Sequence, residues 1–272
     1  MNHPASISRT HAAAMGNSPV NRETDARGVV RLTLNRPEAY NALSEDMMAA
    51  LQSELDALAG DESLRVLVLA GAGKAFCAGH DLKEMRKDPS LEYYRRLFTQ
   101  CSRLMLSLTR LRVPVIARVQ GIATAAGCQL VAQCDLAVAS SEARFAVSGV
   151  NLGLFCSTPS VPLSRNLSRK QAFEMLVTGE FIDAREAQER GLINRVAAPD
   201  ALDAEVERLI SSILAKPRIA LDVGKELFYR QGELGIAAAY DAAAETMACN
   251  MMNEAALEGV QAFIDKRAPK TR

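Results

Sequence analysis

Short runs of hydrophobic residues separated by turns predict β-strands in the first half of the chain. Residues 29–34 are rich in β-branched side chains and alternate between polar and apolar positions, which is typical of a strand. Residues 66–70 are continuously apolar, as expected for a strand that is covered on both faces. The same reasoning predicts strands that begin at Pro114 and Leu136, and a weaker one at residues 144–147.

Hydrophobic residues with helical spacing occupy the intervals between these strands. Ser44 can cap a helix that ends at Gly60, because acidic residues in its first turn complement the helix dipole. Asp183 and Glu186 resemble a capping box, and Gly191 is a stop signal. Beyond residue 153 the pattern is helical throughout. Helices are predicted at residues 44–60, 91–111, 125–132, 183–191, 200–215, 217–230 and 234–267.

Strands that alternate with helices predict an α/β core built on a parallel sheet. A chain of 272 residues, 49% of them hydrophobic, is long enough for one large core of this kind. We expect residues 1–27 to be a disordered tail and residues 28–198 to be the α/β core. Residues 199–272 are expected to form a helical extension that packs on the core or on a neighbouring subunit.

The balance of charges argues against a nucleic-acid partner. The chain has 32 basic and 32 acidic residues, whereas nucleic-acid binding favours a basic surface. No apolar run approaches the length of a membrane span, so no membrane partner is expected. Residues 1–22 contain no acid and faintly resemble a transit peptide, although a disordered tail is the simpler interpretation. We expect a cytoplasmic protein, with the mitochondrial matrix as the alternative.

The six cysteines show no CxxC spacing, which favours buried free thiols in a reducing compartment. Only three histidines occur, and His3 and His11 lie in the predicted tail. His80 is then the only imidazole of the folded region. With so few potential ligands, we expect no metal site.

Two loops rich in small residues follow predicted strands, at residues 73–83 and 121–128. Small side chains leave backbone N–H groups uncovered and let a ligand approach the main chain. Two such loops can direct two N–H donors at one oxygen atom, which is the arrangement of an oxyanion hole. The sequence therefore predicts a site for a reaction that develops negative charge on an oxygen.

The order of these segments resembles the crotonase superfamily, also called the enoyl-CoA hydratase/isomerase family. The resemblance runs in order from residue 29 to residue 268. It includes LNRPE at residues 34–38, NAL at 41–43, FCAGHDLKEM at 76–85, PVIARVQGIATAAGCQLVAQCD at 114–135, TGE at 178–180 and AFIDKR at 262–267.

The resemblance implies a crotonase-like α/β fold, a spiral of repeated ββα units in two stacked sheets with a C-terminal helical extension. In that family the C-terminal helices join subunits into trimers, often paired into hexamers, so residues 199–272 would be the trimerisation segment. The implied substrate is an acyl-CoA thioester. Coenzyme A is part of that substrate, and no other cofactor is expected. The shared chemistry is stabilisation of a thioester enolate by two backbone N–H groups.

By matching position, the resemblance gives the N–H groups of His80 and Ala126 as the oxyanion-hole donors. The CoA moiety would lie along the first loop, and a C-terminal segment of an adjacent subunit would reach the same ligand. The implied substrate-binding residues are Ala78, His80, Asp81, Leu82, Lys83, Ala126, Phe263 and Lys266.

Two carboxylates that hydratases of this family use are missing from the chain. Gln129 stands in the place of one and Gly149 in the place of the other. Glutamine cannot exchange protons near neutral pH, and each positioned acid or base typically contributes about 10²–10⁴ in rate. We expect the standard syn-hydration to be slow. Restoring both glutamates is expected to raise it if the remaining geometry is intact.

Other residues are candidates to replace the missing acids. His80 places an imidazole beside the predicted hole, unless its side chain faces CoA or solvent. Cys156 could be a nucleophile, or simply a small buried residue at a helix start. Asp81 and Asp135 are more simply explained as caps or braces of turns than as bases. Lys83 could contact a phosphate or be an ordinary surface cation.

Three functions fit these observations. The first is an enzyme of the enoyl-CoA hydratase/isomerase type that stabilises a thioester enolate. The second is another reaction of the same family, such as thioester hydrolysis or decarboxylation, which does not necessarily need the two glutamates. The third is a non-catalytic acyl-CoA-binding protein, which the loss of both acids suggests.

Overall fold

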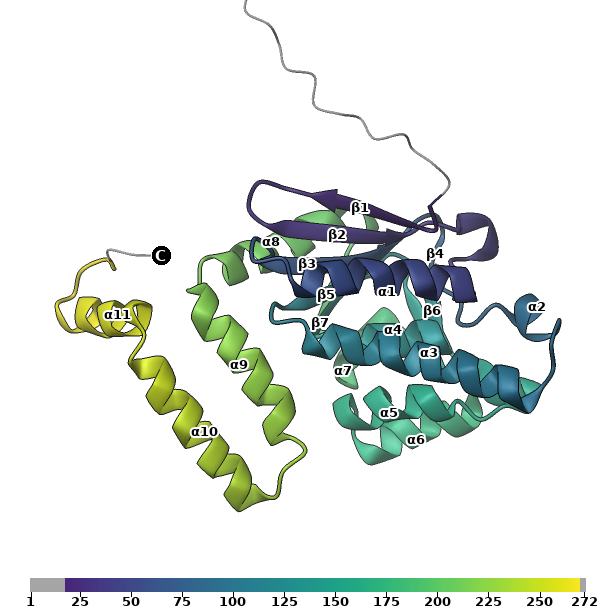
Figure 1. Ribbon diagram of the computed structural model, residues 1–272. Coiled ribbons are helices and arrows are strands. Elements are labelled where there is room, and N and C mark those ends of the chain that lie inside the picture. The colour runs from purple at the N-terminus through teal and green to yellow at the C-terminus, as the bar shows by residue number, and fades with distance from the viewer. Residues whose placement is uncertain (1–17, 270–272) are drawn as a thin grey trace, which may run out of the picture.

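Two β-sheets form the centre of the molecule (Figure 1). The computed structural model describes residues 18–269. Within this range the larger sheet has six strands in the order β1-β2-β3-β5-β7-β10, and the smaller sheet has four in the order β4-β6-β8-β9. The larger sheet comprises β1 (Val20–Thr24), β2 (Val29–Leu34), β3 (Val66–Gly71), β5 (Val115–Val119), β7 (Leu136–Ser140) and β10 (Arg195–Ala197).

The larger sheet is parallel from β2 to β10, which confirms the predicted α/β architecture. The neighbours β2–β3, β3–β5, β5–β7 and β7–β10 all pair in parallel, and β1 joins the edge in antiparallel orientation. All six residues of β3 are buried, as its continuous apolar run predicted. The arrangement in two sheets is the one that the resemblance implied.

The smaller sheet contains β4 (Ala75–Cys77), β6 (Ile122–Thr124), β8 (Arg144–Ala146) and β9 (Ile182–Asp183). Only β8 was predicted from the sequence. Strands of two or three residues are too short to show a period of two, which is why β4, β6, β9 and the short β10 were missed. β4 and β6 pair in parallel and end at the two loops of small residues, so this sheet positions the predicted site.

The predicted helices form close to their expected bounds. Ser44 caps α1 (Glu45–Ala59) by accepting a hydrogen bond from the Met47 N–H at 3.2 Å, and Gly60 follows the last residue. Asp183 caps α7 (Ala184–Glu189) through the Glu186 N–H. The other helices up to residue 214 are α2 (Leu82–Met85), α3 (Leu91–Arg110), α4 (Ala126–Gln133), α5 (Ser157–Asn166), α6 (Arg169–Thr178) and α8 (Leu202–Leu214).

Hydrophobic side chains cover both faces of the larger sheet. On one face, residues of α1, α3 and α4 form the main core with the strands. On the other face, Leu202, Val206 and Ile210 of α8 form a second cluster with Val66 and Val68 of β3. The first helix of the predicted C-terminal segment therefore belongs to the packed core.

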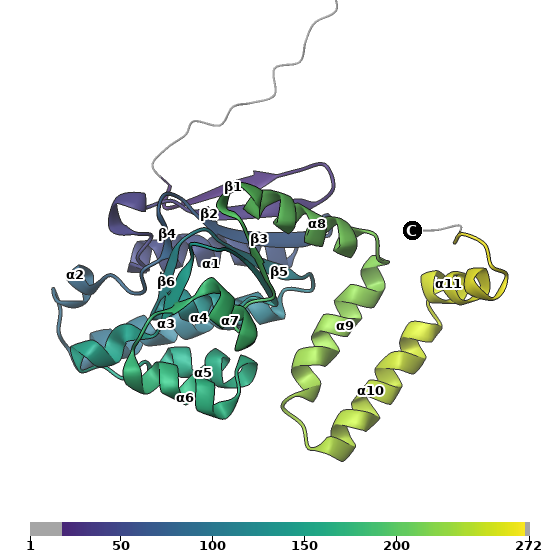
Figure 2. The ribbon, with the colours of Figure 1, turned by 180° about the vertical axis from the view of Figure 1, so that it is seen from behind.

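The remaining helices, α9 (Arg218–Gln231), α10 (Ile236–Met251) and α11 (Glu254–Ile264), extend away from the sheets on the side opposite α2 (Figures 1 and 2). The prediction of a single helix over residues 234–267 is wrong. The chain starts a new helix at Asn253, whose side chain accepts a hydrogen bond from the Ala255 N–H at 3.0 Å. Asn is a strong N-cap, and this signal was overlooked in an otherwise continuous helical pattern.

An ion pair between the buried Lys225 and the partly buried Asp135 anchors α9 to the core. The Lys225 ammonium donates to Asp135 at 2.6 Å and to the carbonyls of Leu108 and Val113 at 3.0 and 2.9 Å. The Tyr229 hydroxyl donates to the other oxygen of Asp135 at 2.6 Å. Burial lowers the pKa of Lys225, and the charge of Asp135 opposes this shift. Asp135 thus has a structural role and fixes α9 on the core, as the simpler interpretation predicted in place of a catalytic base.

The expectation of a disordered tail up to residue 27 is wrong for β1. This strand pairs with β2 from Val20 opposite Leu34 to Thr24 opposite Val30, and Val20 is buried. Its sequence is mostly polar, so its own pattern gave no strand signal. The pairing with β2 supplies the hydrogen bonds that local sequence could not predict. Residues 1–17, including the segment that faintly resembles a transit peptide, lie outside the described residues.

Candidate functional site

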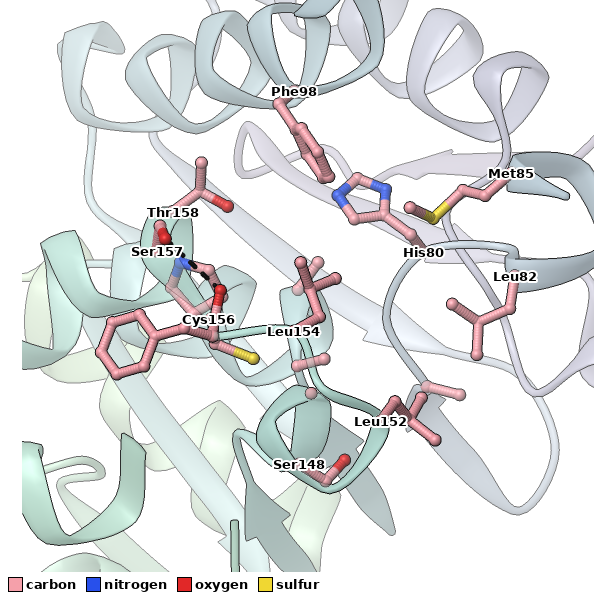
Figure 3. A pocket seen from close by; sticks show the side chains of 16 residues that line it. His80, Leu82, Met85, Phe98, Ser148, Leu152, Leu154, Cys156, Ser157 and Thr158 are labelled. Atoms are coloured by element: carbon pink, nitrogen blue, oxygen red, sulfur yellow. Dashed lines mark hydrogen bonds between the residues drawn. The ribbon is translucent and has the colours of Figure 1, made fainter. Parts of the chain in front are cut away.

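An apolar pocket of about 240 Å³ lies beside the two predicted loops (Figure 3). Of the described residues, none with an Asp, Glu, Lys or Arg side chain lines it, and the titratable groups are those of His80 and Cys156. The lining residues are Ala78, His80, Leu82, Met85, Phe98, Ala125, Ala126, Ser148, Gly149, Leu152, Leu154, Phe155, Cys156, Ser157, Thr158 and Pro159.

The first loop leaves β4 and turns the backbone N–H of His80 away from its neighbours. The Leu43 N–H donates to the Gly79 carbonyl at 2.7 Å, and the Asp81 N–H donates to the Leu43 carbonyl at 3.3 Å. These two bonds flank His80 in a parallel bridge, so its own N–H points to the opposite side. Within residues 18–269 this N–H finds no acceptor.

The second loop leaves β6 and places Ala126 at the start of α4. Ala125 has φ 51° and ψ −120°, a strained conformation for a residue with a side chain, and its N–H is taken by the Ala146 carbonyl at 2.9 Å. Ala126 is the first helical residue, so its N–H has no intrahelical acceptor. The described part of the chain offers it no other one. The helix dipole adds partial positive charge at this position.

Glycines let the two loops touch. Gly79 has φ +93°, and a Cβ built on it would lie 2.9 Å from Ala125 Cβ and 3.3 Å from the backbone nitrogen of Ala126. A Cβ on Gly127 would lie 2.1 Å from the Cys77 carbonyl oxygen. Only glycine fits such close approaches. The structure thus brings the loops of His80 and Ala126 together, each with an N–H group that has no acceptor in the described part of the chain.

The His80 ring enters the pocket. It contacts Phe98 edge to face, with ring centroids 5.5 Å apart, and lies across the pocket from Cys156 and Thr158 (Figure 3). Both ring nitrogens are shielded from solvent and have no hydrogen-bond partner among the described residues. Burial lowers the pKa of His80; the Leu43 carbonyl opposes this shift without reaching hydrogen-bond geometry. The interpretation that this side chain faces solvent is therefore wrong.

The positions of the two missing acids differ in their surroundings. Gln129 is buried in α4, and its Oε1 has no partner within the described range, but the residue does not line the pocket. Gly149 does line the pocket, in the short 3-10 helix Ser148–Leu152. A Cβ on Gly149 would lie 2.6 Å from the Leu154 carbonyl oxygen and 2.7 Å from Cys156 Sγ. The structure therefore has no space for a side chain at this position.

Cys156 immediately precedes α5 and is buried, as its simpler interpretation predicted. Burial raises the pKa of its thiol, and a backbone hydrogen bond with Gly149 opposes the shift. The thiol is therefore mainly protonated at neutral pH, which disfavours a nucleophilic role. Five cysteines of the chain are buried free thiols as expected, whereas Cys249 on α10 is exposed.

Asp81 and Lys83 do not line the pocket. Asp81 caps α2 through the N–H groups of Lys83 and Glu84 at 3.1 and 3.2 Å, and it pairs with Arg36 at 3.3 Å. Burial raises the pKa of Asp81, but these hydrogen bonds and the Arg36 charge outweigh it and lower the pKa. Lys83 lies in a neighbouring polar hollow together with Arg36 and Lys87. Ala78, Leu82 and His80 are the first-loop residues that do line the pocket.

Phe263 and Lys266 are not brought to this pocket by their own chain. Phe263 lies on α11 and is 85% exposed, and Lys266 follows the same helix. α11 and α2 lie at opposite ends of the molecule in both views (Figures 1 and 2). A contact of these residues with a ligand would need a second subunit, as the resemblance implied, and stays a prediction.

One wall of the pocket is formed by residues 152–159, of which only Cys156 was a candidate from the sequence. Leu152, Leu154 and Phe155 expose large hydrophobic surfaces at this wall, with exposed fractions of 70%, 48% and 44%. Phe98 lies in the helix predicted at residues 91–111, but helical spacing does not show which of its side chains line a pocket. A run of apolar residues next to Gly153, where no helix or strand with defined bounds was predicted, was the available signal for a ligand-facing loop.

The fold and the paired loops define the class of this protein as crotonase-like. The chain belongs to the enoyl-CoA hydratase/isomerase family, whose sequence model matches residues 24–272. It is 44% identical over 242 residues to "Enoyl-CoA hydratase domain-containing protein 3, mitochondrial" of Xenopus laevis, covering 89% of this chain and 82% of that protein. The human protein of the same name is 41% identical over 265 residues, covering 96% of this chain and 88% of that protein.

Solved structures agree with this assignment. An enoyl-CoA hydratase from Mycobacterium smegmatis is 64% identical and superposes with a TM-score of 0.91, covering 93% of this chain and 98% of that chain. The human enoyl-CoA hydratase domain-containing protein 3 superposes with a TM-score of 0.88 at 40% identity, covering 93% of this chain and 100% of that chain. Among residues 18–269, no helix has the length and apolar character needed to cross a bilayer.

Proposed function

We propose that the protein is an enzyme that acts on acyl-CoA thioesters by stabilising an enolate. The thioester oxygen would accept hydrogen bonds from the N–H groups of His80 and Ala126. The observation that supports this most directly is that both N–H groups lack an acceptor among residues 18–269 and lie on loops that touch. Donors of this kind, fixed before the reaction, typically contribute about 10²–10³ in rate each.

The pocket favours proton transfer over addition of water. Its lining is largely apolar, which suits an acyl chain, and the described lining residues include no carboxylate that could activate water. Hydration by the two-glutamate route is therefore disfavoured. Isomerisation of an enoyl thioester, which needs an enolate and one mobile proton, fits the pocket better. We propose no cofactor beyond the coenzyme A of the substrate.

We also propose that the protein works as a homotrimer or as a hexamer of two trimers. Helices α9–α11 extend from the core and expose large apolar side chains, a pattern that suits burial against another subunit. In such an assembly, Phe263 and Lys266 could meet the CoA of a neighbour. The exposed apolar residues of these helices include Phe228, Ile236, Tyr240, Met247, Met252, Leu257, Val260, Phe263 and Ile264.

The test uses acetoacetyl-CoA, an acidic β-keto thioester whose enolate absorbs in the near ultraviolet. Binding to the wild-type protein should produce the enolate band, because two N–H donors stabilise the oxyanion. Ala126→Pro removes one donor and should remove the band. Leu91→Pro is the control, because Leu91 is also the first residue of a helix but lies outside the pocket. Circular dichroism checks that each variant folds.

The possible results separate the three functions. A bound thioester without an enolate band contradicts the proposal. Release of free CoA from a panel of acyl-CoAs would instead favour thioester hydrolysis. Tight binding with no turnover of any enoyl-CoA would favour the non-catalytic function.

A further inference from the structure

The His80 imidazole is the unexplained polar group of the pocket. Buried polar atoms in native structures almost always have a hydrogen-bond partner, and each exception calls for an explanation. Here both ring nitrogens are buried and lack a partner within the described residues. An edge-to-face contact with Phe98 alone would be made equally well by an apolar side chain. A bound ligand would supply the missing partner of a ring nitrogen.

We propose that His80 is the acid–base residue of the reaction, moving a proton to and from the α-carbon of the bound thioester. This inference rests on the proposed function. In hydratases of the family, two glutamates transfer the proton; here a residue of the first loop would do so instead.

The position of the ring supports this assignment. The backbone N–H and the imidazole belong to the same residue, and the carbonyl oxygen of a thioester is only two bonds from its α-carbon. A thioester whose oxygen meets the His80 and Ala126 N–H groups therefore places its α-carbon close to the ring. In the view of Figure 3 the ring extends over the cavity rather than away from it.

The surroundings of the ring favour its neutral form, which is the form a base needs. α2 and α3 contribute Met85 and Phe98, and the opposite wall contributes the Cys156 thiol and the hydroxyl of Thr158. No carboxylate or ammonium group among the described residues influences its titration; burial and the Leu43 carbonyl do. Burial lowers the pKa of the imidazole, so it is neutral at pH 7.

The proposed step balances without a further reactant. A neutral ring nitrogen takes the α-proton, and the C–H electron pair becomes the carbon–carbon double bond of the enolate. The carbonyl π pair moves to the oxygen, where the two N–H groups hold it. The imidazolium then returns the proton to the γ-carbon of an enoyl thioester, which moves the double bond. Alternatively, its N–H proton exchanges with a deuteron of the solvent D₂O, and the ring delivers that deuteron to the α-carbon, which gives α-exchange.

The experiment measures exchange of the α-protons of butyryl-CoA in D₂O by mass spectrometry. His80→Gln should slow exchange by about 10²–10⁴, the usual contribution of a positioned acid or base. It should still bind acetoacetyl-CoA and form the enolate band at equilibrium, because both N–H groups remain. His80→Ala should regain exchange when free imidazole is added, whereas imidazole should not accelerate the wild-type protein.

Several results would overturn the assignment. These are exchange by His80→Gln at the wild-type rate, absence of imidazole rescue in a folded His80→Ala variant that binds the thioester, and loss of exchange in Cys156→Ser but not in His80→Gln. A wild-type enolate band with no α-exchange would also overturn it while leaving the oxyanion hole supported. Absence of the band itself would refute the proposed function instead, so the two failures are distinguishable.

Discussion

The surroundings of Gly149 prevent the conversion of this chain into a standard hydratase by substitution. The substitution to study is Gly149→Glu, alone and together with Gln129→Glu, which would restore the two acids of the resemblance. The new Cβ would lie 2.6 Å from the Leu154 carbonyl oxygen and 2.7 Å from Cys156 Sγ, whereas ordinary contacts begin at 3.4 Å. The neighbours would have to retreat by 3.4 − 2.6 = 0.8 Å and 3.4 − 2.7 = 0.7 Å.

The loop resists this movement because its own hydrogen bond ties it together. The Leu154 N–H donates to the Gly149 carbonyl at 3.0 Å, so the carbonyl of Leu154 cannot withdraw without disturbing the turn. Overpacking of this kind typically costs about 1–3 kcal/mol. We expect Gly149→Glu to lower the free energy of unfolding by this amount. Adding Cys156→Ala should recover only part of it, since the backbone contact remains.

Urea denaturation measures the effect, and Gly60→Glu is the matched control. Gly60 follows α1 on the surface, and a Cβ there meets nothing within 4 Å, so its change should stay within about 0.5 kcal/mol. The double variant Gln129→Glu/Gly149→Glu should gain no crotonyl-CoA hydration, contrary to the expectation from sequence. Wild-type stability of Gly149→Glu, or efficient hydration by the double variant, would refute the steric reasoning.

Three further outcomes follow from the structure. Lys225→Met leaves the partly buried Asp135 without its cation and should destabilise the protein by about 3 kcal/mol in thermal denaturation; a change below about 1 kcal/mol would show that the pair is dispensable. Ala125→Gly removes the backbone strain at φ 51° and should stabilise the folded protein by about 1 kcal/mol in the same assay. A loss of stability would show that the backbone is not strained at this residue. Because the pKa of His80 is lowered on folding, the unfolded chain binds the proton more tightly, and stability should fall as the pH drops below about 6.5. His80→Gln should flatten that slope in urea titrations at pH 7.5 and 5.5, and an unchanged slope would exclude His80 as its source.

Elements with many local signals were predictable, and elements built by long-range pairing were not. Ser44 and Gly60 delimit α1 because a cap and a stop act within a few residues. β1, in contrast, is a polar edge strand that exists through its hydrogen bonds to β2. Among the C-terminal helices, the break between α10 and α11 was not predicted. Asn253 caps α11 within a pattern that otherwise looked like one continuous helix.

The candidate site shows the same division. The loops of His80 and Ala126 were found because small residues after apolar strands have a local signature. Apart from Cys156, the wall at residues 152–159 was missed, because a sequence does not show whether exposed apolar residues such as those near Gly153 face another part of the chain. The sequence shows that position 149 has no side chain. Only the structure shows that the surrounding atoms leave no space for one.

The sequence by itself determined four strands of the larger sheet, most of the long helices, the two loops of small residues and the loss of both acids, because these depend on residue type and short-range spacing. The tertiary structure decided where the unpaired groups point. The hydrogen bonds that distant Leu43 makes with Gly79 and Asp81 orient the His80 N–H, and packing against Phe98 holds the ring inside the pocket. The orientations of the N–H group and of the ring depend on contacts between segments far apart along the chain, so a local sequence pattern cannot predict them.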